Sequence, residues 1–258
     1  MGWIGAELLK YKRTFTAKLI IFIPAFFAVY AIATGMIINS NPTAAASGYT
    51  GTSWLSFLAM IYNWWPVLFL PLGMGIFAGL ADSQERKAGR YRALCSHDIS
   101  PFKIWVNKVA GMAVISFLST VILIIIVIAT GLFAAEGTMP LGKILAAGLL
   151  CWFTSLALIP FQLWTAAAGG ILISIGVGFL GSTIGVLLAP TDFWFLCPWS
   201  HAARLMCPVV GVHPNGVLLD SGSALLNTGV IPLGIAASAL FLAVLTTATG
   251  IWFGRREL

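Results

Sequence analysis

The chain has 258 residues, of which 59% are hydrophobic and only 9% charged, and its formal net charge is +6. An ordinary soluble domain carries about 25% charged residues, so this composition excludes one and makes the lipid bilayer the solvent for most of the chain. The apolar stretches run for about 20 residues without the alternation of barrel strands, which predicts an all-α membrane protein.

The first residues form an amphipathic segment. Ile4, Leu8, Tyr11 and Phe15 fall on one face of a helix, and basic residues point away from that face. This pattern predicts an interfacial helix over residues 1–18 that lies on the inner leaflet, and a frayed start of the first span is the alternative.

Six apolar segments follow, and each is long enough to cross the bilayer as a helix. They cover residues 19–38, 54–80, 109–135, 144–163, 168–189 and 229–253. The fourth and fifth are separated only by a short uncharged break at residues 160–165. All Lys and Arg residues except Lys143 and Arg204 lie before the first span, between the second and third, or after the last. Because basic residues concentrate on cytoplasmic loops, we expect both termini and residues 82–108 in the cytoplasm.

Residues 82–108 are the most polar stretch of the chain, and Pro101 within them predicts the start of a helix. Orientation charges on a solvated loop explain the basic residues, but not the acids among them or the neighbouring apolar side chains. We therefore interpret this segment as a docking surface for a cytoplasmic partner that would supply energy, with Leu94 and Trp105 as apolar anchors. The residues expected to couple the chain to this partner are Asp82, Glu85, Arg86, Gly89, Arg90, Leu94 and Trp105.

Residues 190–228 combine prolines, aromatics and scattered charges. They are too polar for a plain crossing and too apolar for a free loop, which predicts a re-entrant or outer-surface helical hairpin. We expect it to act as an outer gate, and Cys197 and Cys207 within it are either free thiols or a disulfide. The expected gate residues are Trp199, His201, Arg204, Pro208 and His213.

The sequence carries no convincing catalytic, metal or nucleotide motif. Residues 137–143 match the first seven positions of a phosphate-binding loop, but Ile144 replaces the Ser or Thr that holds magnesium, and no strand precedes the match. The spacing of His201 and His213 with the nearby cysteines fits no standard metal site. We therefore expect a non-catalytic chain that binds no cofactor of its own.

Glycine pairs stand inside the expected spans. Gly75 with Gly79, and Gly181 with Gly185, have the GxxxG spacing that lets helices approach closely, and we expect the second pair at a contact with a second membrane chain, identical or related. The cores of all six expected spans lack the ionisable residues with which ion-driven transporters bind their coupling ion. Energy for uphill transport would therefore come from elsewhere.

Several segments carry a family resemblance. With the interfacial helix, the six spans and the charged loop, the chain resembles the permeases of ABC-type exporters with the ABCG-like, or type V, fold. Within that class it is most similar to the permeases of lantibiotic immunity transporters. The residues that carry the resemblance are Glu85 to Leu94, Pro160-Phe161-Gln162-Leu163-Trp164, Pro198-Trp199-Ser200 through Arg204-Leu205 to Pro208, Gly211, and Pro214-Asn215-Gly216.

The resemblance implies a single permease domain over residues 1–258 in a bacterial cell membrane. Its partners would be membrane lipid, a second permease, identical or related, and two cytoplasmic ABC ATPases that bind ATP and magnesium, with no nucleic acid among them. The implied substrate is a cationic or amphipathic antimicrobial peptide. Two other functions stay open: an ATPase-independent channel or scaffold, and a lipid-modifying enzyme built from residues 190–228. Co-purification with a nucleotide-binding subunit would distinguish an exporter permease from the channel or scaffold. Catalytic turnover by the purified protein would distinguish the enzyme from a permease.

Overall fold

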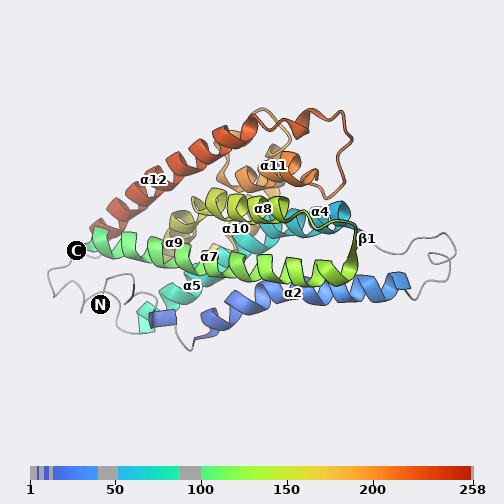
Figure 1. The fold of residues 1–258 in the computed structure, drawn as a ribbon. Helices are drawn as coiled ribbons and strands as arrows, with labels where there is room; N and C mark the ends of the chain where they lie inside the picture. Colours follow the sequence, from blue (N-terminus) through green and yellow to red (C-terminus); the bar gives the residue numbers. More distant parts are fainter. Residues whose placement is uncertain (1–4, 6–8, 12–13, 40–51, 88–99, 257–258) are drawn as a thin grey trace.

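The computed structural model describes residues 5, 9–11, 14–39, 52–87 and 100–256, and these form long helices packed side by side (Figure 1). The described α-helices are α2 (Phe15–Asn39), α4 (Trp54–Trp64), α5 (Leu70–Lys87), α7 (Pro101–Ala134), α8 (Leu141–Ser155), α9 (Leu158–Gly169), α10 (Ile171–Leu188), α11 (Pro198–Val210) and α12 (Val230–Arg256). Shorter pieces are the π-helix η1 (Trp65–Phe69) and the 3-10 helices η2 (Trp194–Leu196) and η3 (Ala224–Leu226). The predicted all-α membrane architecture is confirmed.

One long helical segment, Trp54–Lys87, combines α4, η1 and α5. The Ser53 hydroxyl caps its start by accepting a hydrogen bond from the Ser56 backbone N–H. The π-helical turn η1 contains Pro66, which has no N–H for the helical ladder, so the local hydrogen-bond register changes there.

Helix α7 begins as its sequence predicts. The Ser100 side chain accepts a hydrogen bond from the Lys103 backbone N–H, and Pro101 occupies the first turn, where no N–H is needed. At its far end α7 leads into β2 (Ala135–Glu136), which pairs in parallel with β1 (Thr52–Ser53). This two-residue pairing ties the start of α4 to the end of α7.

Four helices of the described chain are long and apolar enough to cross a membrane, and a fifth span results if α8 and α9 count as one. The predicted break at residues 160–165 is wrong, because these residues lie inside α9. The chain bends by 44° between α8 and α9, and it reverses at Gly170, whose φ of +83° suits a residue without a side chain. Nine of the 18 residues of the predicted interfacial helix lie outside the described residues, and residues 15–18 belong to α2.

Figure 1 shows the end of α5 and the start of α7 at one end of the bundle, together with the start of α2 and the end of α12. The same view shows α11 and its neighbouring loops toward the other end. Large apolar side chains remain exposed on the outer helices, among them Phe179 on α10 and Leu240 on α12. Since a soluble protein would not expose such continuous apolar surface, these faces are suited to lipid.

Candidate functional site

A group of charged side chains gathers where α5 ends, and we call Lys10, Asp82, Glu85, Arg86 and Lys108 the charged cluster. The Lys108 ammonium donates to Glu85 Oε2, and Lys10 Nζ lies 3.2 Å from Glu85 Oε1. Arg86 Nε donates to Asp82 Oδ2 at 2.6 Å, one helical turn away. The Lys108 side chain is only 2% exposed, so its pairing with Glu85 is a buried ion pair that fixes α5 against the first turns of α7.

Arg86 extends the charged cluster to a third helix. Its Nη2 donates to the carbonyl of Ala167 at 3.0 Å and reaches that of Ala166 at 3.5 Å. These carbonyls belong to the last turn of α9, which carries a partial negative charge, and that of Ala166 also accepts from the Gly170 backbone N–H at 2.7 Å. The guanidinium therefore caps α9 while it remains paired with Asp82.

Trp105 was predicted to anchor a partner protein, and the structure contradicts this because the side chain is fully buried within the chain. Its indole Nε1 donates to Thr249 Oγ1 at 2.9 Å, and its ring lies 4.8 Å from that of Phe253 on α12. Lys108 Nζ lies 5.8 Å from the centroid of the Trp105 ring, within reach of a cation–π interaction. Trp105 therefore joins α7 to α12. The other predicted contact residues Gly89, Arg90 and Leu94 lie outside the described residues.

The four glycines of the GxxxG pairs are packed within the chain. A Cβ on Gly79 would lie 2.4 Å from Ile171 of α10, and one on Gly75 would lie 3.0 Å from the Ser174 carbonyl oxygen. A Cβ on Gly181 or Gly185 would collide with Trp199 of α11, at 2.3 Å and 2.8 Å. The predicted role of Gly181 and Gly185 in a contact between two permeases is therefore wrong, because Trp199 fills that face of α10.

The segment 190–228 forms a structured cap that contains α11, η2, η3 and a short hairpin. The fully buried His201 contacts the Phe195 carbonyl through Nε2 (3.0 Å) and the Ser238 hydroxyl through Nδ1 (2.8 Å). The carbonyl can only accept, so Nε2 carries the proton and Nδ1 accepts from Ser238 on α12. Burial lowers the pKa of this imidazole, which favours the neutral form that these contacts require.

Two other predicted gate residues hold the loops of the cap. Arg204 Nη1 donates to the Leu225 carbonyl at 2.8 Å, and its guanidinium lies 5.9 Å from the Trp194 ring centroid. The carbonyl of His213 accepts a hydrogen bond from Asn63 of α4 at 3.1 Å. Pro208 lies within the last turns of α11. Cys197 and Cys207 are free thiols, which decides the question that the sequence left open.

An apolar cavity of about 190 Å³ lies between the middle of α2 and the adjoining parts of α4 and η1. Aromatic rings dominate its lining: the ring centroids of Phe26 and Phe27 of α2 lie 5.2 and 4.9 Å from that of Phe69 of η1, and the Phe27 contact is edge-to-face. The complete lining is Phe26, Phe27, Tyr30, Met60, Trp64, Leu68 and Phe69.

A model of the ABC-2 family of transporter proteins matches residues 3–185, which is most of the chain. The chain belongs to this family. It is thus an ABC-2 type permease, a multi-pass membrane component of a transporter. No curated protein and no solved structure matches it.

Gln162 is a residue of this permease for which the sequence suggested no role. It lies in α9 with no exposed surface, and its side chain contacts Ser174 of α10. The available signal was an amide in an otherwise apolar stretch, where a polar group needs a partner. Among the described residues, no group of three or more His, Cys, Asp or Glu side chains is close enough to hold a metal ion.

Proposed function

We propose that the chain is the permease subunit of an ATP-driven exporter that removes cationic or amphipathic antimicrobial peptides from a bacterial membrane. The charged cluster is the observation that carries the first half of this proposal. It lies where α5 ends and α7 begins, so it holds both ends of the polar segment expected to contact an ATPase. Two such permeases and two ATPases, which bind ATP and magnesium, would complete the transporter.

The buried Glu85–Lys108 pair supports this role because it makes the ends of α5 and α7 move together. A partner that moves residues 88–99 would then displace α5 and α7 together. The movement would extend to α12, because Trp105 of α7 contacts Thr249 and Phe253 of that helix. A merely solvated orientation loop needs no such buried connections.

The topology that we propose has six spans: α2, Trp54–Lys87, α7, the bent pair of α8 and α9, α10, and α12. Helix α2 has 25 residues, which is enough for one crossing. Basic residues around the charged cluster favour the cytoplasm for this end of the bundle, and the cap then lies on the outer side.

Cysteine labelling is expected to confirm this orientation. In a variant with the four native cysteines replaced by serine, Asn215→Cys places an exposed thiol in the cap and Lys87→Cys places one at the end of α5. A membrane-impermeant maleimide should label Asn215→Cys in intact cells and Lys87→Cys only after permeabilisation. The reverse pattern would show the opposite orientation, and labelling of both in intact cells would exclude the proposed span count.

The aromatic cavity between α2 and η1 supports an amphipathic substrate. An apolar cavity of about 150 Å³ stays dry and binds a benzene-sized group, so one of about 190 Å³ has room for an aromatic or short aliphatic side chain. Trp64 and Phe26, both about half exposed, border it on the outer face of the bundle. A peptide that partitions into the membrane could reach this cavity without passing through water.

The proposed function is tested by measuring the resistance of bacterial cells to antimicrobial peptides. Expression of the permease with its ATPase in a sensitive bacterium is expected to raise the inhibitory concentration of cationic, membrane-active peptides severalfold. The protection should disappear when the ATPase cannot hydrolyse ATP. Protection that persists without ATP hydrolysis would favour the channel or scaffold, and no protection against any peptide of a chemically varied panel would refute the proposed substrate class.

A further inference from the structure

Helix α9 is a short segment, and the chain changes direction at each of its ends. The 44° bend at Leu156 and Ala157 separates it from α8, and the left-handed Gly170 separates it from α10. At its last turn it is held by Arg86 of the charged cluster, through the 3.0 Å bond to the Ala167 carbonyl. Any displacement of the end of α5 therefore acts on α9 directly.

Gln162 connects the middle of α9 to α10. In the amide orientation that satisfies both of its polar atoms, Nε2 donates to the Ser174 carbonyl at 2.8 Å and to the Ser174 hydroxyl at 2.9 Å. Oε1 then accepts from the Gly178 backbone N–H at 3.2 Å. Ser174 and Gly178 are four residues apart, so the Ser174 carbonyl and the Gly178 N–H are an acceptor and a donor that an α-helix pairs with one another. The Gln162 side-chain amide bonds to both of these groups. This fixes the register of α9 along α10.

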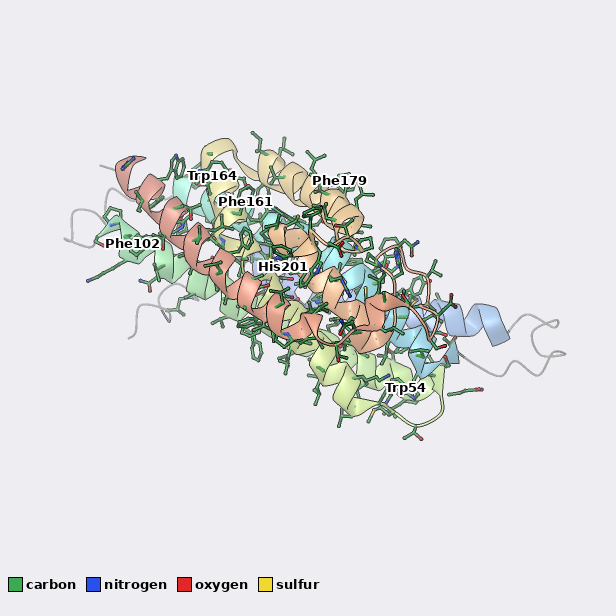
Figure 2. The ribbon with its side chains drawn as sticks, turned by 90° about the horizontal axis from the view of Figure 1, so that it is seen from above. Trp54, Phe102, Phe161, Trp164, Phe179 and His201 are labelled. Carbon is green, nitrogen blue, oxygen red and sulfur yellow. The ribbon has the colours of Figure 1, made fainter. Side chains whose placement is uncertain are left out.

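The packing around Gln162 also opposes sliding of α9 along α10. A Cβ on Gly178 would lie 3.0 Å from the Gln162 amide and from the Pro71 carbonyl of α5, so three helices meet at this point. Directly before Gln162 on α9 is Phe161, whose ring lies 5.2 Å from that of Trp199, the residue that fills the glycine face of α10. Figure 2 shows Phe161 and Trp164 on α9, between α10 and α12, with His201 of the cap nearby.

We propose that α9 transmits movement from the charged cluster to α10 and the cap, and that Gln162 is the positioning residue that fixes α9 on α10. This inference rests on the proposed coupling to an ATPase. A displacement of α5 pulls on Arg86 and tilts α9 about the bend at Leu156–Ala157 and the turn at Gly170. The tilt shifts α10 through Gln162 and moves Trp199 through Phe161. Gln162 moves no ion and binds no ligand in this role.

The first test uses hydrogen exchange of the purified permease in lipid nanodiscs and needs no ATPase. Gln162→Met keeps the length of the side chain but removes its hydrogen bonds. We expect exchange of the α10 amides around Gly178 to become about fivefold faster, as the loss of one net hydrogen bond implies. Ser182→Ala is the matched control, because the Ser182 hydroxyl bonds the Gly178 carbonyl of its own helix and should leave the contact between α9 and α10 intact. Equal exchange in wild type and Gln162→Met would refute the connection.

The second test measures transmission in the permease–ATPase complex. A fluorophore on Asn215→Cys, with the native cysteines replaced by serine, reports on the cap when vanadate traps ADP in the ATPase. The wild-type complex should show a fluorescence shift, whereas Gln162→Met should trap the same amount of ADP with a shift at least fivefold smaller. Ser182→Ala should retain the wild-type shift.

The outcomes separate the two proposals. An undiminished shift in Gln162→Met would refute transmission through α9 and leave the proposed function intact. A wild-type complex that traps no ADP would refute the proposed function and the transmission with it, although faster exchange in Gln162→Met would still establish the α9–α10 connection. A shift lost equally in Ser182→Ala would show a general effect of weakening α10 and would also refute the role of Gln162.

Discussion

Replacement of Glu85 by leucine is expected to destabilise the permease by about 3–5 kcal/mol, the typical cost of breaking a buried ion pair by removing one partner. The carboxylate contacts both Lys10 and Lys108, and the Lys108 side chain is 2% exposed. The leucine variant removes this carboxylate from the buried ammonium, which also lies near the rings of Trp105 and Phe253. Thermal unfolding of the purified protein, followed by tryptophan fluorescence, measures the loss.

Two further variants show whether the ion pair is responsible. The double variant Glu85→Leu with Lys108→Met removes both charges, so it should be clearly more stable than the sum of the two single losses implies. Lys87→Gln is the matched control, because it removes an exposed charge from the same turn of α5 and should change stability by about 0.5 kcal/mol or less. Additive losses in the double variant would mean that Glu85 and Lys108 do not stabilise one another.

The sequence predicted the elements whose physical signals are local. Continuous apolar stretches indicated spans, Pro101 indicated a helix start, and the polar segment 82–108 indicated the end of the bundle where charges gather. The prolines and aromatics of residues 190–228 indicated a helical hairpin, whereas the structure has one α-helix there, α11, with loops and two 3-10 turns.

The errors concern which distant residue each side chain meets. An exposed anchor and a buried tryptophan look alike in sequence, and the partner of Trp105 is Thr249, 144 residues away. GxxxG spacing predicts close approach but does not say what approaches, and at Gly181 and Gly185 it is Trp199 of the same chain. The residues 160–165 suggested a break, yet Pro160 is tolerated in the first turn of α9, where its missing N–H costs little.

Gln162 was overlooked for a different reason. Within the membrane, function was expected at ionisable side chains, because these bind coupling ions. A buried amide satisfies a different requirement: it pairs with backbone groups of a neighbouring helix, which only the packing of α9 on α10 reveals. Arg86 was expected to couple the chain to an ATPase, and its contact with the last turn of α9 depends on a residue 81 positions away.

The central claim is that an ATPase drives this permease through residues 82–108. Leu94→Asp would place a charge in the expected apolar centre of that contact, and Arg90→Glu would reverse a charge at its rim. A rim charge is worth about 1 kcal/mol or less, so Arg90→Glu should cause a partial loss of coupling and Leu94→Asp at least about a tenfold loss. Both residues lie outside the apolar segments that are expected to span the bilayer, so both variants should insert normally.

The most direct test is the ATP hydrolysis that accompanies the tagged permease through purification from the membranes of its own cells. Wild type should carry vanadate-sensitive hydrolysis in a separate ATPase subunit, and Leu94→Asp should lose about 90% or more of it at equal permease yield. Asn215→Asp, an exposed change in the cap, should retain the wild-type rate. Wild-type permease without an associated ATPase, or Leu94→Asp with an unchanged rate of hydrolysis, would contradict the claim that energy enters through this segment.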